Sequence, residues 1–256
     1  VGLQGAGGEA LGPALVAGNT FVLKAHEFTP LSGLALAALA EQVGLPAGVF
    51  NVVTGDGATL GAALVEGADM VTMTGSTRAG RAIYAAGASK IKVLRLELGG
   101  KAPFIVMEDA DIDRAVEAAV TARFTNCGQI CTCNERMYLH RAIAEEFLAK
   151  FVARAGALTI GMPLGSPDLG PKISREEVDK VAAITDASIA AGAEVRLRGG
   201  PLREGAFARG HWMAPTVLVA PRNDLPVMQD EVFGPVVAAM VVDDFEQALT
   251  LANDTA

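Results

Sequence analysis

The chain has 256 residues, of which 51% are hydrophobic and 20% charged, and its formal net charge is −8. This composition is typical of one large or two modest globular domains with a sizeable core, and it excludes a disordered tail. The acidic balance argues against nucleic acid or an anionic membrane surface as a partner, because neither offers countercharge. Apolar runs such as PVVAAMVV at 235–242 have the length of a strand and are too short to span a bilayer.

Two features of the sequence bear on the cellular location of the protein: its N-terminus and its cysteines. The sequence opens on Val1 without a basic, apolar leader, so we expect no secretory signal, and its first residue need not be the natural start. The only three cysteines are too clustered to form a disulfide framework, which indicates a reducing compartment. We therefore expect a cytoplasmic protein.

Short β-branched segments alternate with alanine-rich helical segments along the whole chain. Strands are expected at 20–24, 49–53, 70–74, 91–98, 103–107, 136–140, 193–197, 215–220 and 236–242, and helices at 30–44, 58–67, 77–87, 112–124, 141–155, 174–191 and 244–253. This alternation predicts an α/β fold with doubly wound parallel sheets, covered by helices on both faces. The diglycine at 99–100 interrupts two strand-like runs and predicts a boundary between domains at 1–99 and 100–256.

Three segments directly follow predicted strands and should therefore lie at the carboxyl ends of the sheet, where open α/β sheets bind ligands. In the first, KAHE, Lys24 and Glu27 could hydrogen-bond a ribose diol, and Glu27 would repel a 2′-phosphate and so favour NAD over NADP. The alternative is an exposed pair of loop residues. In the second, Gly75 and Ser76 suit a phosphate at a helix N-terminus, although a plain turn with a helix cap explains the same residues.

The third segment, LELGGKAP, carries Glu97 beside the diglycine turn. A carboxylate that is partly desolvated at the rim of the sheet could have a raised pKa and act as a general base. The alternative is a glutamate that faces solvent on an edge strand. Further along, EVFGP brings Glu231 and Phe233 to a turn that enters a buried strand.

The cysteines at 127, 131 and 133 could form a metal site, a disulfide, a nucleophile with two neighbours, or core residues. The spacing C-x₃-C-x-C and three isolated histidines argue against zinc, and the compartment argues against a disulfide. A nucleophile and buried thiols remain. Gly128-Gln129 lies between a helix end and a strand and could present one thiol in a cleft, with Cys131 as the central candidate. A Cys–His hydrolase that uses His140 is a further alternative.

Six segments of the sequence resemble the NAD(P)-dependent aldehyde dehydrogenase superfamily and occur in the family's order and at compatible spacing. They are GPALVAGNTFVLKAHEFTP, GLPAGVFNVVTGDG, MTGSTRAG, LELGGKAPFIV, CGQIC and DEVFGPV. NCGQICTCNERMYL and ELGGKAPFIVMEDADID look most similar to the branch that acts on lactaldehyde and glycolaldehyde. The resemblance implies part of the cofactor domain at 1–99, most of the catalytic domain at 100–256, a small aldehyde as substrate, and NAD rather than NADP as cofactor. It also implies a homodimer or homotetramer for the full-length parent.

The resemblance further implies a role for each matched residue. Cys131 would be the nucleophile and Glu97 the base that activates the hydrolytic water. The cofactor would be held by Lys24, Glu27, Gly75, Ser76, Glu231 and Phe233. No metal is implied.

Two departures from the family pattern bear on activity. The family's Lys-Pro-x-Glu reads Lys-Ala-His-Glu at 24–27, and the asparagine that stabilises the oxyanion would fall at or before Val1. We therefore expect an internal part of a longer member, inactive by itself, because losing one oxyanion donor typically lowers the rate about 10²–10³-fold. The alternatives are a truncated, non-catalytic homologue that only binds nucleotide or assembles with partners, and a CoA-acylating aldehyde dehydrogenase.

Overall fold

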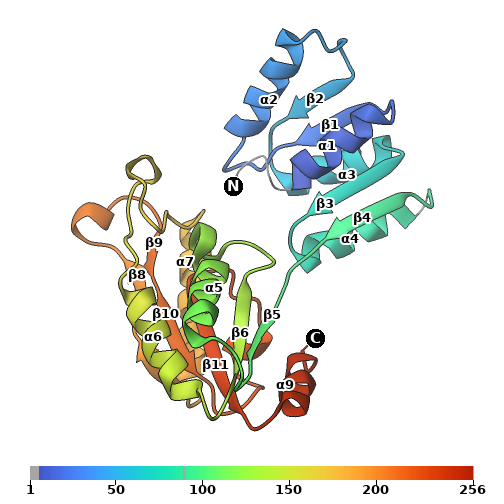
Figure 1. Cartoon of the computed structure of the whole chain (residues 1–256). Coiled ribbons are helices and arrows are strands. Elements are labelled where there is room, and N and C mark those ends of the chain that lie inside the picture. The colour runs from blue at the N-terminus through green and yellow to red at the C-terminus, as the bar shows by residue number, and fades with distance from the viewer. Residues whose placement is uncertain (1–5, 89, 256) are drawn as a thin grey trace. The chain divides into compact units, whose positions relative to one another are not determined.

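The computed structural model describes residues 6–88 and 90–255, with side chains from residue 10 onwards. The chain divides into two compact units, one that ends at Gly99 and one that begins at Gly100 (Figure 1). The division thus falls at the diglycine. None of the helices in the described residues is long and apolar enough to cross a membrane.

The first unit is built from two strand–helix–strand pairs. β1 pairs with β2 and β3 pairs with β4, both in parallel, with Phe21 opposite Phe50 and Met70 opposite Val93. A helix joins the two strands of each pair, as parallel neighbours require. The elements are α1 (Ala6–Val16), β1 (Phe21–Lys24), α2 (Leu31–Gln42), β2 (Phe50–Val53), α3 (Gly57–Gly67), β3 (Met70–Thr74), α4 (Thr77–Ala88) and β4 (Val93–Glu97).

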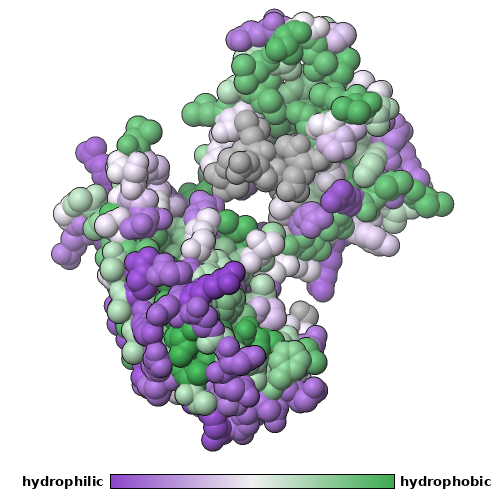
Figure 2. Space-filling view, in the orientation of Figure 1, coloured by the Kyte–Doolittle hydropathy of each residue, from purple (hydrophilic) through white to green (hydrophobic). Residues whose placement is uncertain are grey.

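Side chains of the first unit are poorly buried. On α2, the apolar residues Leu31, Leu34, and Leu39 are 77%, 43% and 54% exposed, whereas Gly33 is buried against Leu23 and Val52. Figure 2 shows this as a largely apolar surface around α2. The strands of this unit therefore hold their register chiefly through backbone pairing and a small set of apolar contacts.

The second unit contains a five-stranded sheet in the order β5-β6-β11-β10-β7. Its strands and helices are β5 (Ala102–Val106), α5 (Ile112–Phe124), β6 (Asn134–His140), α6 (Ala144–Gly156), α7 (Arg175–Ala190), β7 (Glu194–Leu197), β8 (Gly200–Leu202), β9 (Trp212–Ala214), β10 (Thr216–Val219), α8 (Pro226–Gln229), β11 (Val236–Val242) and α9 (Phe245–Ala252). The α/β class with parallel sheets is confirmed, since β5, β6, β11 and β10 run parallel to one another.

Strict alternation was the wrong expectation for one part of the second unit. β7 pairs with β10 in antiparallel orientation, and β8 pairs with β9 as a short antiparallel ladder. No crossover helix lies between β7 and β10, so the chain can only return in the opposite direction. The unpredicted β8, β9 and α8 have three or four residues each, too few to produce a periodic pattern.

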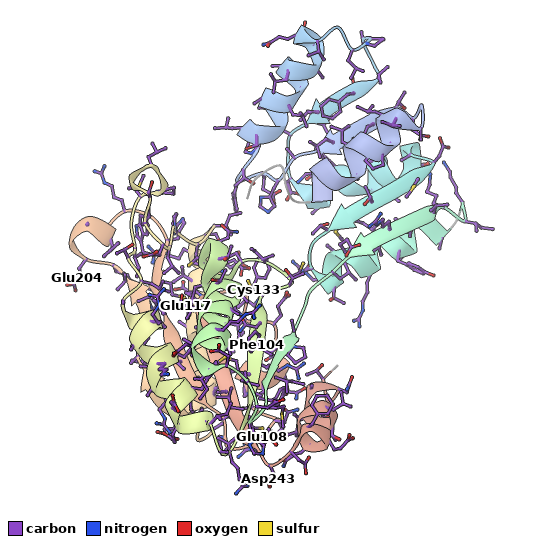
Figure 3. The ribbon with its side chains drawn as sticks, viewed as in Figure 1. Phe104, Glu108, Glu117, Cys133, Glu204 and Asp243 are labelled. Atoms are coloured by element: carbon purple, nitrogen blue, oxygen red, sulfur yellow. The ribbon has the colours of Figure 1, made fainter. Side chains whose placement is uncertain are left out.

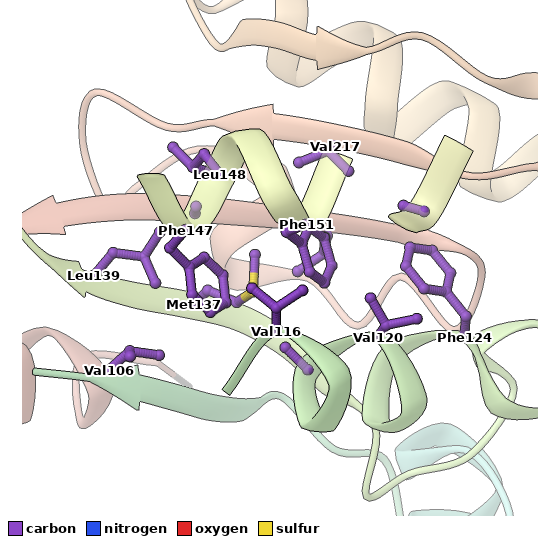
Figure 4. Packing of buried hydrophobic residues seen from close by; sticks show 14 of the residues in the cluster. Val106, Val116, Val120, Phe124, Met137, Leu139, Phe147, Leu148, Phe151 and Val217 are labelled. Carbon is purple, nitrogen blue, oxygen red and sulfur yellow. The ribbon is translucent and has the colours of Figure 1, made fainter. Parts of the chain in front are cut away.

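The hydrophobic core of the second unit lies on both faces of its sheet. Alternate residues of β6 point to opposite faces, so Met137 and Leu139 meet α5 and α6, whereas Tyr138 meets the cluster of α7, α8 and α9. Figure 4 shows Phe147 and Phe151 of α6 stacked over this strand. Each fully buried side chain of this kind contributes about 1.5–3 kcal/mol, and this core holds the segments on either side of the cysteines.

Candidate active site

The cysteine loop begins where α5 ends. Asp111 caps α5 by accepting a hydrogen bond from the backbone N–H of Arg114, and the helix gives way to a 3₁₀ turn at Thr125–Gly128. Asn126, Cys127 and Gly128 all have left-handed backbone angles, with φ of 52°, 58° and 70°. This conformation is unfavourable for residues with a Cβ atom. Packing around the loop must therefore hold it in place.

Gln129 supplies part of that packing. Its side-chain amide donates to the carbonyls of Asn126 and Pro171 at 3.1 and 3.3 Å, and its oxygen accepts from the N–H of Ile173 at 3.0 Å. Gln129 is buried, so all of these polar groups are satisfied inside the protein. The Gln of the GQIC motif thus fixes the loop that carries the thiols.

Burial separates the three thiols. Cys127 is fully buried and Cys133 is 3% exposed, whereas Cys131 is partly exposed. Burial raises the pKa of Cys127 to about 11, in spite of the positive charges of Lys172 and Arg123. Burial likewise raises the pKa of Cys133. The thiolate is the reactive form of a cysteine, and burial disfavours that form at Cys127 and Cys133. Of the three cysteines, Cys131 has the side chain that is partly exposed.

Gly100 connects the cysteine loop to the turn of the EVFGP motif. A Cβ atom on Gly100 would lie 2.1 Å from the carbonyl oxygen of Cys131, so only glycine permits this approach. The N–H of Gly100 donates to Oε1 of Glu231 at 2.8 Å. The second unit therefore brings together Cys131 and Glu231, two of the residues selected from the sequence, through one glycine.

Phe233 is the other predicted residue of this turn. It is partly buried and has a left-handed backbone with φ of 55°. The ammonium of Lys172 donates to the carbonyl of Phe233 and lies 5.6 Å from the centre of its ring. Burial lowers the pKa of Lys172 to about 8. Both the backbone and the ring of Phe233 are therefore held from one side by a buried amine.

In the first unit, Lys24 and Glu27 form an ion pair of 2.8 Å at the end of β1, and they are 20% and 37% exposed. The hydrogen bond from Lys24 lowers the pKa of Glu27. The Lys24 ammonium lies 3.6 Å from where a Cβ atom on Gly57, the first residue of α3, would stand. The Lys24 ammonium and the Glu27 carboxylate thus offer a donor and an acceptor near the N-terminus of α3. Gly57 has no side chain there to fill the space beside the ammonium.

Gly75 and Ser76 follow β3 and precede α4. The N–H of Gly75 donates to the carbonyl of Glu97 at 3.0 Å, and Oγ of Ser76 accepts from the N–H of Ala79 at 3.2 Å. These are the contacts of a turn and a helix cap, the alternative that the sequence left open. The position at the N-terminus of a twelve-residue helix remains suited to an anion.

Glu97 is the last residue of β4. Its side chain is 55% exposed and lies 3.6 Å from the guanidinium of Arg95. Among the described residues, the carboxylate is therefore exposed to solvent. Its role as a general base stays a prediction.

His140 lies at the wrong end of the sheet for a Cys–His pair. It is the last residue of β6, whereas Cys131 precedes the first, and six residues of strand span roughly 20 Å. His140 instead approaches Glu108 at 3.7 Å. Figure 3 shows Cys133 and Glu108 at opposite ends of the sheet. Among the described residues, no group of three or more His, Cys, Asp or Glu side chains could hold a metal ion.

The sequence profile of the aldehyde dehydrogenase family matches residues 6–256. The chain belongs to the aldehyde dehydrogenase family. Its curated relatives include 3,6-anhydro-α-L-galactose dehydrogenases of Vibrio sp. (strain EJY3), 46% identical over 97% of this chain and 52% of the relative, and of Streptomyces coelicolor, 48% identical over 95% and 50%.

Solved structures of family members superpose closely on this aldehyde dehydrogenase chain. A 3,6-anhydro-L-galactose dehydrogenase in complex with NADP (NAP) is 46% identical with a TM-score of 0.94, over 97% of this chain and 53% of that one. Lactaldehyde dehydrogenase from Escherichia coli is 40% identical with a TM-score of 0.91, over 96% and 52%. The resemblance to the superfamily and to lactaldehyde dehydrogenases is confirmed. The chain spans about half the length of the curated relatives it matches.

Four charged residues around the EVFGP turn were missed by the sequence analysis: Arg123, Glu135 and Lys172 are buried, and the side chain of Lys101 is 9% exposed. A signal was available for one of them, because Glu135 and Arg136 stand at the start of a strand that otherwise reads as buried. Charged residues are rarely buried unless they are paired. The partners, however, come from distant parts of the sequence, so the pattern by itself could not identify them.

Proposed function

We propose that the natural protein carrying this chain oxidises an aldehyde to a carboxylic acid with a nicotinamide dinucleotide, and that Cys131 is its nucleophile. One observation carries the proposal: Cys131 is the partly exposed cysteine of the three, and Gly100 holds its backbone against the turn of Glu231 and Phe233. The membership of the family supports the same chemistry.

The proposed reaction proceeds in two covalent stages. The Cys131 thiolate attacks the aldehyde carbon, the C–S bond forms, and the carbonyl electron pair moves to oxygen to give a thiohemiacetal. A bound nicotinamide cofactor would supply the acceptor for the hydride of this carbon, and loss of that hydride would leave a thioester on Cys131. Glu97 then takes a proton from water, the hydroxide adds to the thioester, and the C–S bond breaks to release the acid and the thiolate.

The cofactor is proposed to lie along the residues matched to the family. Lys24 and Glu27 offer a donor and an acceptor that fit the hydroxyls of a ribose, beside the space left by Gly57. Ser76 at the start of α4 suits the pyrophosphate. Glu231 and Phe233 would hold the nicotinamide ribose and ring. In this assignment the unit up to Gly99 binds cofactor and the unit from Gly100 carries the nucleophile.

NAD is proposed as the preferred cofactor. The carboxylate of Glu27 is kept ionised by Lys24, and a negative charge beside the ribose disfavours a 2′-phosphate. Because a similar dehydrogenase is in complex with NADP, the test of this preference compares kcat/KM for NAD and for NADP in the natural protein. The names of the relatives support a small hydroxylated aldehyde as substrate. A cytoplasmic homodimer or homotetramer completes the proposal.

The decisive experiment replaces Cys131. Cys131→Ser in the natural protein should abolish aldehyde-dependent formation of reduced cofactor, because a serine hydroxyl is not ionised at neutral pH. Cys133→Ala, a change of a buried neighbour, serves as the matched control and should keep turnover within a few-fold. Full activity of the Cys131 variant would reject the assignment.

Two alternatives predict different outcomes in the same preparation. A non-catalytic homologue would bind cofactor without forming a thioester when an aldehyde is added. A CoA-acylating enzyme would require CoA for turnover and release no acid in its absence. Family membership favours the hydrolytic dehydrogenase over both.

A further inference from the structure

A buried carboxylate outside the proposed chemistry holds the turn that carries Glu231 and Phe233. Glu135 lies in β6, and its side chain is 2% exposed. One oxygen, Oε1, accepts the N–H of Phe233 at 2.7 Å, and the other, Oε2, accepts the N–H of Val232 at 2.7 Å. A single side chain thus satisfies two consecutive backbone donors of the turn.

Two cations balance the charge of Glu135. The Lys101 ammonium donates to Oε2 at 2.8 Å and to the carbonyl of Val227 at 2.8 Å, and the Arg123 guanidinium lies 3.7 Å from Oε1. Burial alone would raise the pKa of Glu135, but these two cations outweigh it and the pKa is lowered. The carboxylate is therefore ionised at neutral pH, and its bonds to the two N–H groups are charge-assisted.

The turn needs such support because its backbone is strained. Phe233 adopts a left-handed conformation that persists in a residue with a Cβ atom only when its surroundings enforce it. Glu135 binds the N–H of Phe233, and Lys172 binds its carbonyl from the other side. Both polar groups of this residue are thus fixed by buried charges.

The same cluster reaches the cysteine loop. Arg123 is fully buried and donates to the carbonyls of Gly128 and Gly234 at 2.9 and 2.8 Å. A Cβ atom on Gly128 would lie 2.3 Å from the carbonyl oxygen of Gly234, so loop and turn are in direct contact. Lys101, Arg123 and Glu135 therefore form a charged cluster that sets the spacing between the thiol loop and the turn. Among the described residues, Glu135 supplies the carboxylate that pairs with both cations.

We propose that Glu135 is a positioning residue: by binding the N–H groups of Val232 and Phe233, it sets Glu231 and the Phe233 ring for the nicotinamide half of the cofactor. This inference rests on the proposed function, which assigns Glu231 and Phe233 to that half. It adds a residue that touches neither the cofactor nor the aldehyde and acts through the backbone.

The test is Glu135→Gln in the natural protein. A glutamine would direct an NH₂ group at a backbone N–H or at Lys101, where an acceptor is required. We expect a loss of about 10–100-fold in kcat/KM for the cofactor, mainly through a higher KM, as for other supporting residues one step from a site. In the absence of cofactor, the rate at which iodoacetamide alkylates Cys131 in this variant should stay within about two-fold of the rate in the protein without the substitution.

Two further variants complete the experiment. Glu135→Asp keeps the charge on a shorter side chain and should restore part of the cofactor KM. Glu145→Gln removes an exposed carboxylate, which accepts from Arg196, and should change neither KM nor alkylation. If Glu135→Gln does not fold, the cofactor KM of Glu135→Asp decides: a rise supports the proposal and an unchanged value overturns it.

The outcomes separate positioning from a purely structural role. If Glu135→Gln lowers the melting temperature but leaves the cofactor KM and the turnover per alkylatable Cys131 unchanged, the proposal is overturned. Failure of the proposed function itself is visible earlier, since the unmodified protein would then form no reduced cofactor from any aldehyde.

Discussion

At the scale of single residues, charge and burial decide which groups can react. Cys127, Cys131 and Cys133 lie within seven residues of sequence, yet only Cys131 is more than marginally exposed. Its neighbours are enclosed by the core and by the loop. Chemical identity therefore selects three candidates, and the packing around α5 and β6 reduces them to one.

Lys172 gives a prediction at the same scale. Its pKa is lowered from 10.5 to about 8 by burial, so the folded state binds its proton less tightly than the unfolded state does. Below pH 8 the burial of the charge destabilises the fold in full. Between pH 8 and 10.5 the folded state loses this proton first, and stability rises relative to a variant without the amine, by at most about 3 kcal/mol.

The measurement is urea unfolding of the protein and of Lys172→Met from pH 7 to 10.5. As the pH rises, the free energy of unfolding of the protein with Lys172 should increase relative to that of Lys172→Met. Lys150→Met is the control: hydrogen bonds from the exposed Lys150 to Asp113 and Glu146 raise its pKa above 10.5, so both states keep the proton and the difference should not change between pH 7 and 10.5. A difference independent of pH at position 172 would contradict the prediction.

At the scale of elements, the connection between α5 and β6 is the feature that orients the thiol. Three consecutive left-handed residues lead out of the helix, and they are held by Gln129, Arg123 and the contact of Gly128 with Gly234. The local sequence prefers other conformations, so tertiary contacts impose this one. Glycine at 128 is needed for its backbone angle and for the close approach.

Gly128→Ala tests this double requirement. An alanine there should lose about 1–2 kcal/mol for the left-handed angle and a further 1–3 kcal/mol, roughly, for the clash with the Gly234 carbonyl. Gly205→Ala is the matched control, since Gly205 has a φ of 57° with no atom within 4 Å of the added Cβ. Thermal or urea unfolding of both variants gives the comparison. Equal losses would show that the contact with Gly234 carries no energy.

At the scale of the whole molecule, the two units differ in how much apolar surface they bury. Both hydrophobic clusters lie entirely in the second unit, between Phe104 and Ala252. The first unit has few buried side chains among its described residues, such as Leu11 and Val65. Because apolar burial is the main driving force for folding, stability should be distributed unequally between them.

Residues 100–256 expressed alone should therefore unfold in one cooperative transition, whereas residues 1–99 alone should melt without a sharp midpoint. Circular dichroism during heating measures both. The intact chain provides the control for the position of the transition. A gradual melt of residues 100–256 would show that its two clusters do not suffice, and that the unit depends on the rest of the protein.

The sequence by itself determined the fold class, the positions of most of the longer strands and helices, and the family, because periodicity and short motifs are local properties. It selected Cys131, Glu231 and Phe233 from such motifs, and the tertiary structure joined them through Gly100. Only the tertiary structure could show that β7 runs antiparallel to β10 and that His140 lies at the opposite end of β6 from the cysteines. It also shows that the Glu97 side chain is exposed among the described residues. Only it could assemble Lys101, Arg123, Glu135 and Lys172. A buried charge is tolerated where its partners meet it in space, and a partner here is up to 126 residues away in sequence.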